Sequence, residues 1–259
     1  MTTDHFSKVA PVAKKYAAIL FDLDGTLIDS TPAVIAHWTQ FGKDYGIDPA
    51  LILATSHGRR TIDIIKQWRP ELANMDYVRE VEGRIPKEHA ADAKELPGTR
   101  TLVSSLHKTR AKWAIVTSGT SALAEPWVKL IGFPRPEVFM TADKVVNGKP
   151  DPEGYLLARK QLGLSKTVEP PADVLVVEDA PAGIRAGKAA GCDVLALLTT
   201  HSREEVEAAG ADFVVEDLES VEWLGGDEDG ILLLINPTPP PTVSVLQLGP
   251  KLINEVLPN

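Results

Sequence analysis

Residues 17–26 read AAILFDLDGT, a short apolar run that ends in two aspartates and a glycine. An uninterrupted apolar run of this length is typical of a strand that is buried on both faces of a parallel sheet. Asp22 and Asp24 stand two residues apart, so their side chains share one face of an extended segment. Gly25 then allows the chain to turn away. The segment therefore predicts a buried strand that presents two carboxylates at its carboxyl end.

Later apolar runs repeat this pattern along the chain. Helical stretches separate them, and alternating strands and helices predict a doubly wound, Rossmann-like α/β fold, in which helices cover both faces of a parallel sheet. The expected strands lie at 17–23, 113–117, 173–178, 193–198 and 212–215, and the expected helices at about 121–131, 152–162, 182–190 and 203–209.

The longest interval between expected strands, residues 31–96, holds only helical segments. Ser30 precedes it, and it begins with Thr31 and Pro32, a pattern that starts a helix. We expect these residues to form a helical cap domain, inserted into an α/β core that consists of residues 1–30 and 97–236. The insertion follows the carboxyl end of a strand, where open α/β sheets bind their ligands.

The composition changes after the last expected core segment. Residues 237–259 contain six of the 20 prolines and only two charged residues. We expect an extended, proline-rich tail there, on which catalysis does not depend. The apolar run ILLLI at 231–235, just before the tail, suggests an additional edge strand.

The overall composition limits the classes of function. With 36 acidic and 27 basic residues the net charge is −9, so we expect no nucleic-acid partner. A single cysteine, Cys192, excludes an internal disulfide and a multi-cysteine zinc site. No apolar run approaches the roughly 18 residues of a membrane span, and the first residues lack the apolar segment of a secretory signal. We therefore expect a cytoplasmic protein with no membrane contact and no obligate protein partner.

Polar residues at the ends of later expected strands complete a candidate site. Thr117 ends the second expected strand and Ser118 follows it, and their hydroxyl and backbone N–H groups could hold phosphate oxygens. Glu178 and Asp179 are adjacent acids at the end of the third strand, and Lys149 precedes a proline in a loop. Together with the two aspartates of the first strand, these residues offer a nucleophile, a second acid, anion-binding groups and metal ligands.

Each of these segments also has a plainer interpretation. The hydroxyl and acidic residues are common helix caps, and Lys149 could be a solvated loop lysine. A calcium loop counted from Asp22 fails, because Ala33 stands where that loop needs glutamate. A phosphate-binding Walker A loop fails as well, because Asp143 stands where it needs glycine.

The combination is far more specific than its parts, and with it the sequence resembles the haloacid dehalogenase-like superfamily of phosphatases. The four motifs of that superfamily are matched in order by Asp22-Leu23-Asp24-Gly25-Thr26, Thr117-Ser118, Lys149 and Glu178-Asp179. The helical insertion resembles the cap of that family. The segments SHGRRT (56–61), NGKPDP (147–152) and EDAPAGIRAGKAAGC (178–192) are further similar to the fungal glycerol-phosphate and 2-deoxyglucose-6-phosphate phosphatases.

This resemblance implies a covalent phosphatase mechanism. Asp22 would attack phosphorus and form an aspartyl-phosphate, while Asp24 would protonate the leaving alkoxide and later activate water. Thr117, Ser118 and Lys149 would hold the phosphoryl group. Mg²⁺ would be the cofactor. Its implied ligands are Asp22, the backbone carbonyl of Asp24, Glu178 and Asp179.

The implied substrates are small phosphate monoesters such as glycerol, deoxy-sugar or polyol phosphates. The cap is expected to select among them, with His57, Gly58 and Arg60 as the candidate substrate contacts. We favour Arg60 over Arg59 by the same resemblance, and the alternative is that both arginines only cap or solvate the next helix. Two other functions stay open, a sugar phosphomutase of the same superfamily and a non-catalytic protein that binds a phosphorylated ligand or a partner.

Overall fold

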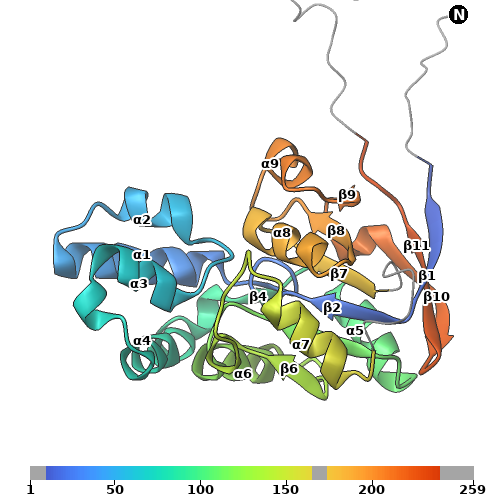
Figure 1. Ribbon diagram of the computed structural model, residues 1–259, viewed down its shortest axis with the longest axis horizontal. Helices are drawn as coiled ribbons and strands as arrows, with labels where there is room; N and C mark the ends of the chain where they lie inside the picture. The colour runs from blue at the N-terminus through green and yellow to red at the C-terminus, as the bar shows by residue number, and fades with distance from the viewer. Residues whose placement is uncertain (1–9, 165–173, 240–259) are drawn as a thin grey trace, which may run out of the picture.

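The computed structural model describes residues 10–164 and 174–239. Its centre is a six-stranded parallel sheet with the strand order β6-β5-β2-β7-β8-β9 (Figure 1). The strands are β2 (Ala18–Phe21), β5 (Trp113–Val116), β6 (Val138–Met140), β7 (Val174–Glu178), β8 (Asp193–Leu197) and β9 (Phe213–Val215). All five strands expected from the sequence are confirmed, and β6 is an addition at one edge.

Helices cover both faces of this sheet. One face packs against α5 (Thr99–Lys108) and α6 (Ser121–Ile131), and the other against α7 (Glu153–Gln161), α8 (Pro181–Ala189) and α9 (Arg203–Ala208). Ile19 and Phe21 of β2 belong to the first hydrophobic cluster and Leu20 to the second, because successive side chains of a strand point to opposite faces. The prediction of a doubly wound α/β fold is therefore confirmed.

A second, antiparallel sheet lies at the end of the core that is remote from α1 and α2 (Figure 1). Its strands are β1 (Val12–Tyr16), β10 (Val221–Asp227) and β11 (Gly230–Ile235), with β11 in the middle. The expectation that residues 231–235 add an edge strand is wrong in position, because β1 and β10 pair with both sides of β11. The proline-rich tail beyond residue 239 lies outside the described residues.

Four helices fill the interval in which the sequence predicted only helices. They are α1 (Thr31–Tyr45), α2 (Pro49–Ser56), α3 (Thr61–Trp68) and α4 (Met75–Glu88), and we call them the inserted helices. Their buried residues form a separate hydrophobic cluster around Trp38, Phe41 and Ile64. Two short strands, β3 (Ile28–Asp29) and β4 (Lys94–Glu95), pair where the chain leaves and re-enters the core.

Short 3₁₀ helices complete the described elements. They are η1 (Pro70–Leu72), η2 (Ala90–Asp92), η3 (Ala142–Lys144) and η5 (Leu218–Ser220). Across residues 10–164 and 174–239, no helix combines the length and the apolar character that a membrane crossing requires.

Candidate active site

The strand order brings the chemically distinctive segments to one edge of the sheet. β2 lies between β5 and β7, so the carboxyl ends of these three parallel strands are neighbours. Asp22 directly follows β2, Thr117 follows β5, and Glu178 is the last residue of β7. The chain runs from β2 to β5 on one side and from β7 to β8 on the other, and a switch point of this kind between neighbouring strands is where α/β proteins bind their ligands.

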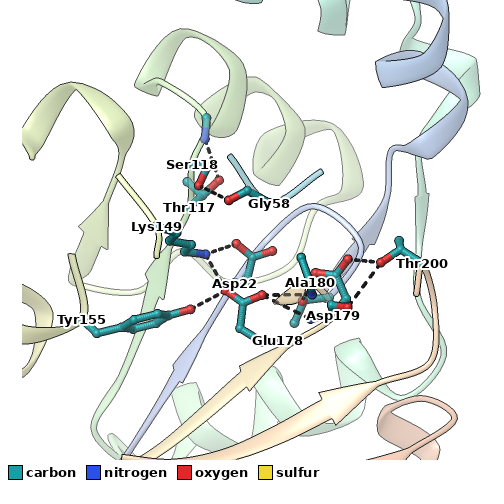
Figure 2. Close-up of polar contacts among 12 residues, drawn as sticks. Asp22, Gly58, Thr117, Ser118, Lys149, Tyr155, Glu178, Asp179, Ala180 and Thr200 are labelled. Carbon is teal, nitrogen blue, oxygen red and sulfur yellow. Dashed lines mark hydrogen bonds and ion pairs between the residues drawn. The ribbon is translucent and has the colours of Figure 1, made fainter. Parts of the chain in front are cut away.

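Lys149 joins two of the acids in a buried ion-pair network. Figure 2 shows its amine between Asp22 and Glu178, with Nζ 2.5 Å from Oδ1 of Asp22 and 2.7 Å from Oε1 of Glu178. Tyr155 also donates a hydrogen bond to Oε1 of Glu178, at 2.6 Å. Burial would lower the pKa of Lys149, but the two carboxylates outweigh it and raise that pKa above its ordinary value. The lysine is therefore a fixed positive charge beside Asp22.

Asp179 lies on the other side of the same cluster. Its carboxylate accepts hydrogen bonds from the hydroxyl groups of Thr26, at 3.2 Å, and Thr200. Burial, followed by the charge of Glu178, raises the pKa of Asp179 to about 7. Asp22, Glu178 and Asp179 each offer one carboxylate oxygen, and these oxygens lie within 4.8 Å of one another.

These three carboxylates fit a magnesium ion. They are hard oxygen ligands, which Mg²⁺ prefers, and a single lysine cannot balance their negative charge. Burial also raises the pKa of Asp22 well above its ordinary value, although the charge of Lys149 opposes this. A divalent cation would offset the remaining charge. The carboxylate of Asp24 does not belong to this cluster, and the sequence implied only its backbone carbonyl as a ligand.

Asp24 begins the turn that leads from β2 to the inserted helices. Ser30 donates a hydrogen bond of 2.6 Å to its Oδ1 atom, while burial raises the pKa of Asp24 above its ordinary value. A carboxyl group with a raised pKa can keep a proton near neutral pH and donate it. Gly25 makes the turn possible, because it has a φ of +86° and a Cβ atom there would lie 2.3 Å from Asp179.

The turn after β5 contacts the inserted helices directly. The hydroxyl of Thr117 accepts a hydrogen bond from the backbone N–H of Gly119 at 3.0 Å. The hydroxyl of Ser118 donates one of 2.8 Å to the carbonyl of Gly58 (Figure 2). A Cβ atom on Gly58 would lie 2.6 Å from that of Ala180, after β7. The turn 56–60 therefore rests against the core at the candidate site.

The structure bears on the expected preference for Arg60 over Arg59, because the two side chains lie in different surroundings. Arg60 donates to Asp63 at 2.8 and 3.0 Å and to the carbonyl of Val146 at 2.9 Å, so its guanidinium fastens α3 to a loop of the core. It does not line the cavity that contains Asp22, whereas Arg59 does. Adjacent side chains point in different directions here, because Arg60 is the extended residue that precedes the first turn of α3.

A cavity of about 80 Å³ separates the core acids from the inserted helices. Its core side includes Asp22, Asp24, Thr117 and Ser118, and its other side includes Val34, His37, Trp38, His57, Gly58, Arg59 and Glu82. A larger groove of about 550 Å³ lies between α1 and α4, but none of the core acids lines it. The smaller cavity is therefore the candidate active site.

His57 and Glu82 enter this cavity from the inserted helices. The ring of His57 stands edge-on to that of His201, with 5.8 Å between centroids, and burial lowers its pKa. Glu82, on α4, is 1% exposed and accepts a hydrogen bond of 2.7 Å from the backbone N–H of Thr120. Burial raises the pKa of Glu82. His57 was expected from the sequence, whereas Glu82 was not, since a glutamate in a polar helix gives no signal of burial.

Comparison with known proteins agrees with this arrangement. The profile of the haloacid dehalogenase-like hydrolases matches residues 16–191, and the chain belongs to this family. It is 42% identical over 220 residues to glycerol-1-phosphate phosphohydrolase 2 of Saccharomyces cerevisiae, covering 83% of this chain and 88% of the relative. It is 38% identical over 231 residues to 2-deoxyglucose-6-phosphate phosphatase 1 of that yeast, covering 84% and 94%.

A solved structure of a hydrolase from Pseudomonas syringae is also similar. Its TM-score is 0.68 at 28% sequence identity, over 79% of this chain and 94% of that chain. The family resemblance inferred from the four motifs is therefore confirmed, and the protein is a hydrolase.

Proposed function

We propose that the protein is a Mg²⁺-dependent phosphatase that hydrolyses small phosphate monoesters of glycerol, other polyols or deoxy-sugars. The observation that carries this proposal is the position of Asp22. It lies at the edge of the cavity, is bonded to Lys149 at 2.5 Å and is grouped with Glu178 and Asp179. The names of the two yeast relatives support the substrate class.

Asp22 is the nucleophile in this proposal. Its carboxylate attacks phosphorus and forms an aspartyl-phosphate, which divides a very slow hydrolysis into two easier steps. The mechanism requires that Asp24 carries a proton at the start, and the burial that raises its pKa favours this state. It donates that proton to the leaving alkoxide and then accepts one from the water that attacks the aspartyl-phosphate.

The remaining core residues offset the charge of the phosphoryl group and position its oxygens. The ammonium of Lys149 attracts the phosphoryl oxygens, and the hydroxyl and backbone N–H groups of Thr117 and Ser118 orient them. Mg²⁺, when bound, would supply positive charge that lets an anionic carboxylate approach an anionic phosphate. Its proposed ligands are Asp22, Asp179, the backbone carbonyl of Asp24 and, beside them, Glu178.

The inserted helices are proposed to act as a cap. We assign residues 31–96 to the cap and residues 1–30 and 97–236 to the core. The turn 56–60 closes the cavity against the core through the Gly58 carbonyl and Ser118, which excludes water from the reacting groups. A cavity of about 80 Å³ suits a leaving group of a few carbon and oxygen atoms. The cytosolic location and the absence of nucleic-acid and protein partners remain expectations from the sequence.

Phosphate release tests this function. The purified protein is incubated with glycerol 1-phosphate, 2-deoxyglucose 6-phosphate and p-nitrophenyl phosphate, in Mg²⁺ and in excess EDTA. We expect inorganic phosphate in Mg²⁺, none in EDTA, and recovery when Mg²⁺ is restored. Full activity in EDTA would contradict the metal assignment. Transfer of the phosphoryl group to another sugar hydroxyl without phosphate release would indicate a mutase, and binding without turnover would indicate a non-catalytic protein.

A further inference from the structure

One buried polar atom at the cavity forms no hydrogen bond within the part of the chain that the structure describes. His37, on α1, lines the cavity with Asp22 and Asp24, and it also borders the larger groove between α1 and α4. Its Nε2 atom is buried and forms no hydrogen bond within the described residues. Among the described residues, two other buried side-chain atoms lack a hydrogen-bond partner, one on Trp68 and one on Thr120. Neither of these residues lines the cavity.

A buried polar atom without a partner destabilises a protein and needs an explanation. The ring of His37 packs edge-on against that of Trp38, with 4.9 Å between centroids. A bound molecule in the cavity would supply the missing hydrogen bond.

The protonation state of the His37 ring indicates which chemical group it can bind. Burial, followed by the charge of His89, lowers the pKa of His37 to about 4, so the imidazole is neutral near pH 7. Its Nε2 atom is then a donor in one tautomer and an acceptor in the other. A hydroxyl group complements both tautomers, whereas an ionised phosphate or carboxylate can only accept. Val34 and Trp38 line the same wall and offer apolar contact to carbon atoms.

We propose that Nε2 of His37 binds a hydroxyl group of the leaving alcohol. His37 is then a specificity-determining residue, which favours phosphate esters of polyols over those of simple alcohols. This inference rests on the proposed phosphatase function, because it places the leaving group on the wall opposite the core acids.

The test compares two substrates that differ only in hydroxyl groups, glycerol 1-phosphate and n-propyl phosphate. The wild type is expected to prefer glycerol 1-phosphate in kcat/KM by about tenfold or more, since an unpaired buried group opposes binding of the propyl ester. His37→Phe keeps an aromatic ring without a nitrogen. It should lower kcat/KM for glycerol 1-phosphate by about 3- to 10-fold and change that for n-propyl phosphate by less than about twofold.

Control variants separate this role from a structural one. His37→Gln keeps a donor and an acceptor and should retain more of the preference than His37→Phe. His107→Phe makes the same change at an exposed position of α5 and should leave both substrates unaffected. Thermal unfolding shows whether each variant is folded. If His37→Phe is not folded, His37→Leu gives the same comparison.

The outcomes distinguish the two proposals. Equal kcat/KM for both esters in the wild type would overturn the role of His37, and so would an unchanged preference in a folded His37→Phe or His37→Leu variant. An equal loss on both esters would also overturn it, because that result indicates only a packing role. If the wild type releases phosphate from neither these esters nor p-nitrophenyl phosphate, the phosphatase function itself is contradicted, and the role of His37 falls with it.

Discussion

The two walls of the cavity are held in different ways. On the core wall, buried ion pairs join the reacting groups to one another, with Lys149 bonded to both Asp22 and Glu178. On the wall built by the inserted helices, Nε2 of His37 has no partner among the described residues, and Arg59 donates a hydrogen bond to the backbone carbonyl of Thr55 in α2. The difference indicates that the side chains of the core are fixed in position for one reaction. The inserted helices, in contrast, keep polar groups available to bind the leaving group.

Removing the nucleophile should have the largest effect. Asp22→Asn replaces a carboxylate that must attack phosphorus and bind the metal, so kcat should fall on the order of 10⁴-fold or more. Steady-state phosphate release measures this, with thermal unfolding to show that the variant is folded. Asp76→Asn is the matched control, because the side chain of Asp76 is 97% exposed on α4, and it should keep full activity. Turnover within tenfold of wild type in a folded Asp22→Asn protein would remove Asp22 from the mechanism.

The contact between the two walls can be broken at Gly58. A Cβ atom there would lie 2.6 Å from that of Ala180, so Gly58→Ala should hold the inserted helices away from the core. Displacement of this kind should lower kcat/KM about 10- to 100-fold. The measurement is phosphate release from glycerol 1-phosphate.

Gly46→Ala is the control for Gly58→Ala. Gly46 has a φ of +68°, close to the +71° of Gly58, but nothing lies within 4 Å of a Cβ atom there. Both variants should lose about 1 kcal/mol of unfolding free energy to backbone strain, and only Gly58→Ala should lose activity. An equal loss of activity in both would show that closure at Gly58 has no special role.

The adjacent arginines sharpen the comparison within one turn. Arg59 lines the cavity, so Arg59→Ala should raise KM about 3- to 10-fold if its charge attracts the anionic ester. Arg60 bonds to Asp63 and to the carbonyl of Val146, so Arg60→Ala should chiefly lower the thermal unfolding temperature. Kinetics and calorimetry on both variants measure this. A larger KM effect at Arg60 than at Arg59 would restore the expectation from the sequence.

The smallest expected effect concerns Glu82. Burial raises the pKa of Glu82 above its ordinary value of 4.5, so the folded protein binds this proton more tightly than the unfolded chain. The wild type should therefore lose unfolding free energy relative to Glu82→Gln as the pH rises above about 4.5. The amide can still accept the hydrogen bond from the Thr120 N–H.

Denaturant unfolding at two pH values tests the role of Glu82. The difference in unfolding free energy between wild type and Glu82→Gln should shift toward the variant between pH 5 and pH 7.5. Glu88→Gln, at an exposed position of the same helix, should show no such trend. A difference that stays constant with pH would mean that Glu82 does not titrate as a buried acid.

The residues of the core wall could be predicted because the local sequence shows where each strand ends, and the topology of a parallel sheet brings these strand ends together. Asp22, Thr117 and Glu178 follow buried apolar runs, and parallel strands bring their carboxyl ends together. The wall of inserted helices could not be predicted in this way. Arg59 and Arg60 are adjacent in the sequence, and only the start of α3 decides which one faces the cavity.

Two further features depend on contacts between distant residues. Glu82 is buried where α4 packs against α6, and His37 of α1 lines the same cavity as Asp22 and Asp24 of the core. In the same way, β1 pairs with β11, more than 200 residues later in the chain. No local pattern of residues 12–16 indicates that partner, and for this reason the second sheet was missed.

Trapping the covalent intermediate tests the central claim most directly. The wild-type protein is mixed with glycerol 1-phosphate in Mg²⁺, quenched in acid within milliseconds to seconds, digested and measured by mass spectrometry. The account predicts one acid-stable, base-labile phosphoryl group on the peptide that contains residues 17–26, located at Asp22. Phosphoryl transfer to another residue would contradict the account. Rapid phosphate release with no phosphorylated Asp22 at any quench time would also contradict it.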